Sequence, residues 1–259
     1  MSGSISKLGS QYVVDLEATN CQSGDSLGGQ LAQADSKERV IRTLSEASTK
    51  LRVKLGESTA SNRKFQAPVE EATTRSLAAL QAYSLGLKAR FSDGEAAAIP
   101  LLVRATELDP NFAMAYASLG TTYSNLGRPA LGATLLSKAF SLREGVSSPE
   151  QFHIDSLYYD LVTGDAPRAI EVYQSWRQIY PRQATPYINL GVIYETFGQQ
   201  EKSIEEERKA LSFDFEIGAV YANLATSYVR LNQLDKAGQI IAEAKPVECR
   251  IPGFWNLST

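Results

Sequence analysis

A spacing of 34 residues recurs along this chain and restricts the folds open to it. The stretch YINLGVIYETFG, residues 187–198, is echoed 34 residues later by YANLATSYVRLN, residues 221–232, and upstream by YASLGTTYSNLG, residues 116–127. Each stretch begins with Tyr, has Leu three places later and has a second Tyr seven places later. Apolar residues at i, i+3 and i+7 indicate the buried face of an α-helix. A chain of such helices predicts stacked repeats in place of one central core.

Extending this frame in both directions gives five consecutive repeats, each predicting two helices joined by a turn. Small residues at positions 8 and 20 let the two helices approach closely, and bulky residues at positions 4, 7 and 11 fill the space between pairs. One pair cannot bury this face alone, so the repeats must stack. The predicted repeats are 79–112, 113–149, 150–183, 184–217 and 218–251.

The spacing and the residue types resemble those of tetratricopeptide repeats (TPRs). The resemblance implies a mainly α fold over residues 73–246, in which helical hairpins form a solenoid with a right-handed superhelical twist. The third repeat departs most from the pattern. His153 and Ser156 stand where an aromatic residue and Leu are usual in the family, and Trp176 stands where Ala is usual.

Residues 1–56 lack the period and predict a small α/β segment. Three strand candidates, SISK, SQYVVDLEATN and SLGGQLAQA, precede an apolar stripe of helical spacing that runs from Val40 to Leu55. Asp35 and Glu38 have the spacing of a capping pair for this helix. The segment therefore predicts about three strands and one helix, with an open strand edge.

The order of these parts resembles the C-terminal sensory region of certain bacterial signalling proteins, chiefly serine/threonine protein kinases and also winged-helix regulators. In them a small FlgO-like α/β domain precedes a TPR array. The resemblance makes residues 1–56 a partial FlgO-like domain and residues 57–72 a polar linker. Residues 247–259 are then a C-terminal tail, packed on the last repeat, or a truncated sixth repeat.

Composition argues against several classes of function. The net charge of −3 gives no electrostatic footprint for nucleic acid. No apolar run reaches the roughly 18 residues that cross a bilayer, and residues 1–10 lack the apolar core of a signal peptide. Cys21 and Cys249 have no disulfide or zinc-site pattern. We therefore expect a cytoplasmic protein with no membrane segment and no nucleic-acid partner in this chain.

No motif predicts catalytic, cofactor-binding or metal-binding residues. The stretch GDSLGG lacks the spacing of a phosphate loop, and DFE, residues 214–216, matches the kinase metal-binding tripeptide by chance alone. His153, the one histidine, occupies a core-facing position without a nucleophile motif. EEER, residues 205–208, is interpreted as the solvent-exposed face of a helix. The sequence thus predicts no enzyme and no cofactor.

The TPR resemblance implies a binding groove lined by positions 5, 6 and 9 of the first helices. Position 6 would supply a row of small polar groups for the backbone of an extended peptide, with apolar neighbours holding its side chains. Asn is also common at this position in TPRs, so Asn189 and Asn223 have a purely structural role as the alternative. The predicted groove residues are Tyr83, Leu87, Ser118, Thr121, Asp155, Tyr158, Ile188, Asn189, Val192, Asn223 and Thr226.

The sequence as a whole predicts a non-catalytic module that binds a protein or peptide partner. A clamp for a C-terminal carboxylate is not expected, because Tyr83 and Leu87 occupy the clamp positions of the first repeat. The alternative function is self-association into a homodimer through the open strand edge of residues 1–56. An enzyme is the third possibility, and it would require a pocket of converging ionisable groups.

Overall fold

The structure is a computed structural model that describes residues 2–20, 23–56, 73–213, 218–244 and 255–256. The chain forms two compact units. The first unit comprises residues 1–162 together with 249–259, and the second unit comprises residues 163–248. The division falls within the predicted third repeat, which is also the repeat that departs most from the TPR pattern.

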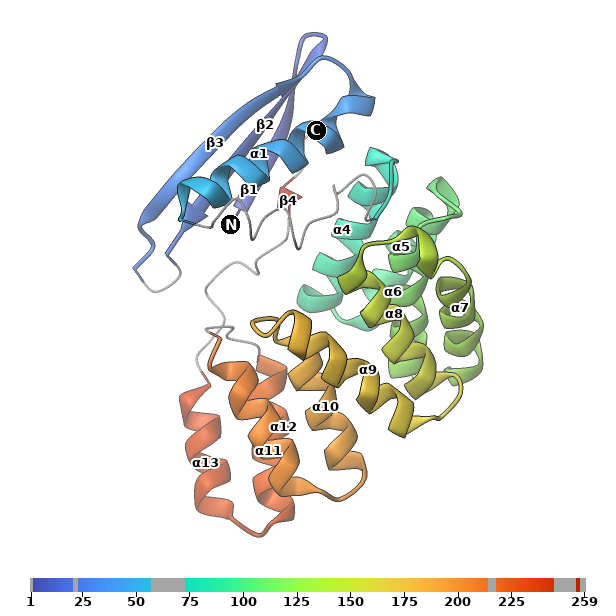
Figure 1. Ribbon diagram of the computed structural model, residues 1–259, viewed down its shortest axis with the longest axis vertical. Helices are drawn as coiled ribbons and strands as arrows, with labels where there is room; N and C mark the ends of the chain where they lie inside the picture. Colours follow the sequence, from blue (N-terminus) through green and yellow to red (C-terminus); the bar gives the residue numbers. More distant parts are fainter. Residues whose placement is uncertain (1, 21–22, 57–72, 214–217, 245–254, 257–259) are drawn as a thin grey trace. The chain divides into compact units, whose positions relative to one another are not determined.

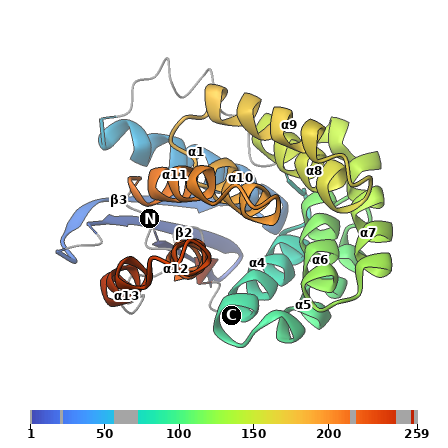
Figure 2. The same ribbon diagram turned by 90° about the horizontal axis from the view of Figure 1, so that it is seen from below.

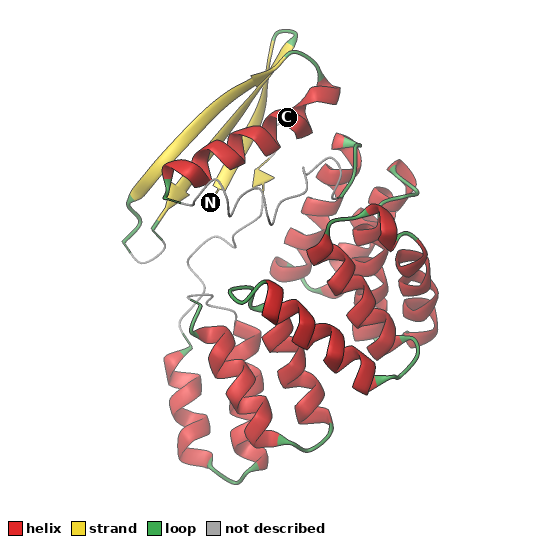
Figure 3. Ribbon diagram, viewed as in Figure 1, coloured by secondary structure: helices red, strands yellow, loops and turns green. Residues whose placement is uncertain are grey.

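The first unit begins with an antiparallel sheet that is covered on one face by a helix (Figure 3). The alternation predicted for its middle strand is confirmed, because Val14 and Leu16 are buried whereas Asp15 and Glu17 are exposed. Leu44 and Leu51 of the helix close the core. The elements are β1 (Ser2–Leu8), β2 (Gln11–Thr19), β3 (Ser26–Ala34) and α1 (Val40–Lys54).

The start and end of α1 differ from the prediction. The carboxylate of Asp35 does not cap the helix; it accepts a hydrogen bond of 2.7 Å from Arg39 Nη1. A short 3₁₀ turn, Lys37–Arg39, leads into the helix instead. Leu55 lies beyond the last helical residue and is exposed, so the buried stripe ends at Leu51.

A fourth strand, which the sequence did not predict, joins this sheet. Strand β4 (Trp255–Asn256) pairs in parallel with β1, Gly3 opposite Trp255 and Ser4 opposite Asn256, so that the strand order is β3-β2-β1-β4. β4 comes from the segment predicted as a tail or a truncated repeat. The predicted linker, residues 57–72, lies outside the described residues, as do Cys21 and Cys249.

Among the described residues of the first unit, five α-helices follow α1. α4 and α5 pack as one hairpin, α6 and α7 as the next, and α8 packs against α7 and α6 (Figure 1). The Ser147 and Glu150 side chains form a capping box at the start of α8. The helices are α4 (Leu77–Ser92), α5 (Glu95–Leu108, with Pro100 inside it), α6 (Ala113–Asn125), α7 (Pro129–Ser141) and α8 (Ser148–Leu161).

The second unit is helical throughout its described residues. α10 pairs with α11 and α12 pairs with α13, as Figures 1 and 2 show, and α11 packs against α12. Gly198, at φ 72°, turns the chain between α10 and α11, as its place in the repeat predicts. The helices are α9 (Ala166–Ile179), α10 (Thr185–Thr196), α11 (Gln200–Leu211), α12 (Gly218–Arg230) and α13 (Leu234–Glu243).

Close contact between the two helices of a hairpin explains the small residues at positions 8 and 20. A β-carbon built on Gly120 would lie 2.8 Å from Leu136 Cγ and 3.0 Å from the Gly132 carbonyl oxygen. One built on Gly132 would lie 2.8 Å from the Gly120 carbonyl oxygen. Any larger residue at either position would therefore force α6 and α7 apart.

Candidate functional site

The predicted groove residues lie on the first helix of each hairpin and on α8. α6 contacts α8 in the first unit, and α10 contacts α12 in the second. We call the predicted residues on each unit's helices its first-helix face. In the first unit these are Tyr83, Leu87, Ser118, Thr121, Asp155 and Tyr158, and in the second they are Ile188, Asn189, Val192, Asn223 and Thr226.

Tyr83 and Ser118 are brought together between α4 and α6. The Ser118 hydroxyl donates a hydrogen bond of 3.3 Å to the Tyr83 phenol, and the Tyr83 ring packs on Phe112 at a centroid distance of 4.9 Å. Burial raises the pKa of the Tyr83 phenol above its ordinary value. Ser118 is buried. This pair therefore joins neighbouring repeats, a role that the sequence did not reveal.

Asp155 and Tyr158 make their contacts at the end of α7 and just beyond it. Asp155 forms an ion pair of 3.2 Å with Arg143, and burial raises the pKa of its carboxyl while Arg143 opposes that shift. The Tyr158 ring stacks on Phe140 at 3.8 Å between centroids, and the Arg143 guanidinium lies 3.7 Å from the same Phe140 ring. These groups hold α8 to the preceding helix.

Leu87 and Thr121 complete the set in the first unit. Both are half-buried. The Thr121 hydroxyl donates to the Ala117 carbonyl of its own helix at 2.9 Å. Neither residue lies in a described core cluster, so both remain accessible in part.

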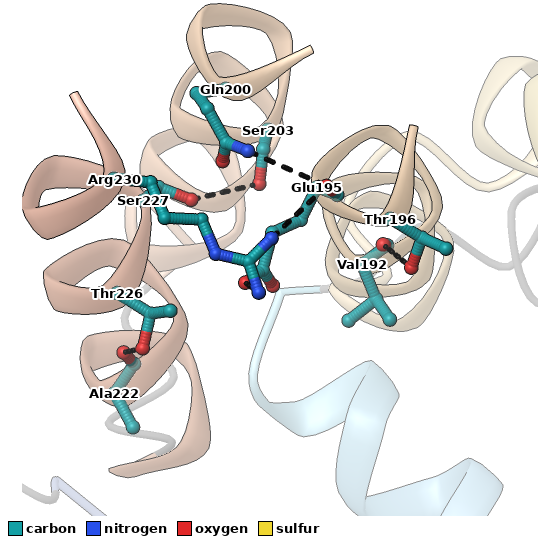
Figure 4. Close-up of polar contacts among 9 residues, drawn as sticks. All are labelled: Val192, Glu195, Thr196, Gln200, Ser203, Ala222, Thr226, Ser227 and Arg230. Atoms are coloured by element: carbon teal, nitrogen blue, oxygen red, sulfur yellow. Dashed lines mark hydrogen bonds and ion pairs between the residues drawn. The ribbon is translucent and has the colours of Figure 1, made fainter. Parts of the chain in front are cut away.

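In the second unit, some of the predicted groove residues pack in the core and others are exposed to solvent. Ile188 packs against the cluster of Val220 and Leu224, and it therefore serves the core. Val192 is 41% exposed and Thr226 is exposed, and Figure 4 shows them on the adjacent helices α10 and α12. The Thr226 hydroxyl bonds its own helix, at the Ala222 carbonyl, 2.9 Å away. Val192 and Thr226 thus offer a methyl-rich surface to solvent, with half-buried Asn189 one turn before Val192.

A cluster of polar side chains lies between α10, α11 and α12, and we call it the polar seam. Figure 4 labels its members Glu195, Gln200, Ser203, Ser227 and Arg230. Its hydrogen bonds cross between the helices. Ser227 Oγ donates to Ser203 Oγ at 3.3 Å, and Gln200 Nε2 donates to the Glu195 carbonyl at 3.4 Å. The seam comprises Glu195, Gln200, Ser203, Glu207, Asn223, Ser227 and Arg230.

Arg230 closes the solvent side of the seam. Its guanidinium donates to the Glu195 carbonyl at 3.4 Å and forms an ion pair with Glu195 Oε1 at 3.2 Å. Half of the Arg230 side chain is exposed, whereas the Glu195 side chain is mostly buried. The positive charge of Arg230 is therefore directed to Glu195 and joins α12 to α10.

Glu207 is the most unusual member of the seam. It is fully buried, and within the described part of the chain neither carboxyl oxygen has a hydrogen-bond partner of good geometry. Burial raises the pKa of its carboxyl to about 8, and repulsion by Glu195 adds to the shift. The nearby Ser203 hydroxyl and Asn223 amide favour the charged form and so oppose it. Asn223 is thus directed at Glu207 within the seam, in agreement with the structural alternative for this residue.

The buried Glu207 corrects the interpretation of EEER, residues 205–208, as a solvent-exposed face. Glu205 and Arg208 are exposed and Glu206 is half-buried, but Glu207 is not exposed at all. The run covers about one helical turn, so one of its four residues must point inward. The repeat count alone does not identify that residue, because position 24 is the buried Glu207 in the fourth repeat and the exposed Ile241 in the fifth.

The third repeat encloses its unusual residues His153 and Trp176 in packed surroundings. Burial, with the nearby charge of Arg90, lowers the pKa of His153 to about 4, so the imidazole is neutral at neutral pH. Trp176 is buried on α9, and its indole donates to Gln183 Oε1 at 2.6 Å. Among the side chains that the structure places, no three His, Cys, Asp or Glu residues gather as metal ligands would.

None of the described helices combines the length and the apolar character that a membrane span requires.

Comparison with known proteins confirms the type of fold. Residues 101–132 and 184–216 each match a sequence model of the tetratricopeptide repeat. TTC0263, a thermophilic TPR protein of Thermus thermophilus, is 20% identical over 64% of this chain and 90% of its own, with a TM-score of 0.51. A monomeric mutant of IFIT1 with Gppp-AAAA is 17% identical over 65% of this chain and 42% of its own, also at 0.51.

A third structure, the MamA protein, is 23% identical over 64% of this chain and 90% of its own, with a TM-score of 0.37. No curated protein matches the sequence. The two structures with a TM-score of 0.51 show that the predicted TPR-type fold is right. The predicted link to FlgO-like domains and to protein kinases stays a prediction, as do the repeat boundaries and the groove residues.

Proposed function

We propose that this chain is a non-catalytic interaction module that binds a peptide or a partner domain on its first-helix faces. The observation that carries the proposal is the exposed pair at position 9 of successive repeats, Val192 on α10 and Thr226 on α12. Their neighbours Ile188 and Leu224 are taken up by packing. The same 34-residue spacing that builds the fold thus also repeats an accessible surface.

An extended peptide suits this surface better than a compact ligand. Val192 and Thr226 supply apolar contacts on adjacent helices, and the Asn189 amide can hydrogen-bond a peptide backbone between side-chain contacts. A protein partner also agrees with the net charge of −3, which disfavours the phosphate backbone of a nucleic acid. The Gppp-AAAA in the IFIT1 structure concerns IFIT1 alone. An RNA oligonucleotide therefore serves as a negative control in the experiment below.

In finer detail, we assign the module to the regulatory C-terminal region of a cytoplasmic bacterial signalling protein of the serine/threonine kinase type. The order of a small sheet-and-helix segment followed by TPR-type hairpins supports this assignment. Partner capture would then place a protein near the effector part of the signalling protein.

The binding surface is tested with a double variant, Val192→Arg plus Thr226→Arg. Both side chains are exposed, so the variant should fold, while two long cations cover the apolar surface. The control is Ile241→Arg on the second helix α13, where the side chain is 63% exposed. A partner captured from lysate is identified. The Kd of this partner is then measured for the wild type, the double variant and the control variant. The Kd of an RNA oligonucleotide for the wild type is measured alongside.

We expect the double variant to weaken binding at least tenfold and the control to leave the Kd unchanged. Equal affinity of all three proteins would place the partner elsewhere and reject the first-helix face. Tighter binding of RNA than of the protein partner would reject the proposed class of partner.

Self-association through β3 is the second candidate function. β3 ends the sheet, and its nine residues, SLGGQLAQA, include no charged residue and no proline, the usual protections of an exposed edge. Leu27 and Leu31 are 57% and 60% exposed. We expect Leu31→Lys to shift a dimer toward monomer in sedimentation equilibrium. A wild-type chain that stays monomeric at high concentration would reject this candidate.

A further inference from the structure

In the first four repeats the residue at position 24 is buried, and in the first, second and fourth it meets the small residue at position 8. In the fifth repeat the residue at this position, Ile241, is 63% exposed. A β-carbon on Gly86 would lie 2.9 Å from Leu102 Cδ2, and one on Gly120 would lie 2.8 Å from Leu136 Cγ. Tyr173 holds position 24 in the third repeat and is also buried. The site thus requires a side chain that fills the space between the two helices of a hairpin.

The fourth repeat places an acid at this core position. A β-carbon on Gly191 would lie 2.8 Å from Glu207 Cγ and 3.2 Å from its Oε1. The carboxyl group therefore lies against the backbone of α10, where the helix has no side chain to shield it. Glu207 fills the site to the same depth as Leu136, and it carries a polar group into it.

Among the residues that the structure places around Glu207, no positive charge balances an ionised carboxylate. Glu195, from α10, has the same charge. Arg230, from α12, is bound to Glu195, and on the outer side of α11 Arg177 of α9 is bound to Glu206. Among the described residues, Glu207 forms no ion pair. An isolated charge in such a site is far more costly than a neutral acid.

Two serine hydroxyls make the surroundings of α11 polar. Ser203 lies one turn before Glu207, and Ser227 of α12 donates to Ser203 Oγ at 3.3 Å; both serines are fully buried. Position 20, which is Ser203 here, is Ala98 in the first repeat and Gly132 in the second. The fourth repeat therefore replaces apolar residues with polar ones at two successive core positions of α11.

We propose that Glu207 carries a proton in the folded second unit at neutral pH, and that the packing of α10, α11 and α12 depends on this proton. The seam is a proton-controlled contact, firm when Glu207 is neutral and weakened when it ionises. This inference concerns the second unit alone and stands whether or not the first-helix face binds a partner.

The direction of the pH dependence follows from the two protonation states. The ordinary pKa of the carboxyl is 4.5, and in the folded unit it is raised to about 8. Between these values the folded state binds more protons than the unfolded state, so stability falls as pH rises. The opening equilibrium of the seam increases by up to about tenfold per pH unit and levels off above the folded pKa. Tyr187, whose pKa is raised from 10.0, titrates outside this window.

The test is amide hydrogen exchange of the full chain between pH 5.5 and 9, with rates divided by the intrinsic rate at each pH. Peptides from α10 to α12 report the seam, and peptides from α6 and α7 serve as the internal control. The variants are Glu207→Gln, which keeps the shape, and Glu207→Leu, which places in the seam the residue found at Leu136. We expect opening of the wild-type seam to rise up to about tenfold per pH unit and to level off above about pH 8.

Both variants should lack this rise, and the α6 and α7 peptides should show none in any protein. A flat wild-type profile, or variants with the wild-type slope, would overturn the proposal. A further variant, Glu195→Gln, removes the neighbouring negative charge and should move the plateau to lower pH. A plateau that stays in place would assign the slope to another group and would also overturn the proposal.

Discussion

The hairpin α6/α7 and the hairpin α10/α11 have the same geometry and opposite chemistry at their closest approach. In each, a β-carbon on the glycine of the first helix would lie 2.8 Å from the γ-carbon of the residue at position 24. That residue is Leu136 in one and Glu207 in the other, and both are fully buried. The 34-residue spacing therefore sets the shape of a hairpin, whereas the residue at position 24 determines whether the core of that hairpin responds to pH.

The surroundings of Leu136 and Glu207 explain why each hairpin accepts its own residue at position 24. Leu136 packs in an apolar cluster with Ala113, Ala139 and Ile154. Glu207 shares its surroundings with hydroxyl and amide groups and with the acid Glu195. Exchanging the two residues therefore should not have equal and opposite effects.

The largest effect is expected from Leu136→Glu, which places an acid in the apolar hairpin. The new carboxyl would be buried without partners, so the free energy of unfolding of the first unit should fall by about 3–5 kcal/mol. Urea unfolding followed by circular dichroism measures this loss. Leu136→Met keeps the site apolar and should cost less than about 1.5 kcal/mol. If Leu136→Glu costs no more than this control, the two hairpins do not differ as described.

The second largest effect is expected when a methyl group is added to the glycine at position 8 of each hairpin. In Gly120→Ala the new β-carbon meets backbone atoms, the Gly132 carbonyl oxygen at 3.0 Å and the Leu136 nitrogen at 3.2 Å. In Gly191→Ala its close contacts are with the flexible side chain of Glu207. We expect losses of about 2–3 kcal/mol and about 1 kcal/mol, respectively, in urea unfolding. The reverse order would show that α10 and α11 are the more tightly held pair.

Glu207→Leu should stabilise the second unit, and only at high pH. At pH 9 the wild-type carboxyl is ionised and unpaired, so its replacement should raise the free energy of unfolding by roughly 1–3 kcal/mol. At pH 5 the wild-type carboxyl is neutral and the gain should nearly vanish. Denaturant unfolding at the two pH values measures the difference, and a gain that is the same at both would contradict a titrating Glu207.

The smallest effect is expected at His153, the basic residue at position 4 of the third repeat. Position 4 is Tyr116, Tyr187 and Tyr221 in the second, fourth and fifth repeats, Ala82 in the first and His153 in the third. The folded pKa of His153 is lowered to about 4 from 6.5, so the folded state binds fewer protons and stability falls as pH drops from 6.5 toward 4. At pH 5.5, His153→Phe should remove a penalty of about 1 kcal/mol that is absent at pH 8. A difference between variant and wild type that does not change with pH would reject a neutral, buried imidazole.

Much of the fold was predictable because it depends on short-range patterns. Tyr187, Leu190 and Gly191 are buried where the repeat places them, and the alternation of Val14 and Leu16 gave the middle strand. These patterns depend on residues a few places apart on one helix or strand. The period then indicated how the helices pair, since every repeat must present the same face.

The remainder depends on contacts that no local pattern encodes. The pairing of β4 with β1 joins residues about 250 places apart. The hydrogen bond between Ser118 and Tyr83 requires knowing which side of each helix faces the next repeat. Glu207 was missed because an acid within a charged run is normally exposed, and because position 24 is buried in the fourth repeat but exposed in the fifth.

The most direct test of the central claim is a titration of the Glu207 carboxyl by ¹³C NMR in the full chain. The carboxyl signal is assigned by its loss in Glu207→Gln and followed from pH 4 to pH 10. We expect a midpoint near pH 8, with the acid mostly neutral at pH 7. A midpoint below about pH 5, the range of an ordinary exposed glutamate, would contradict it.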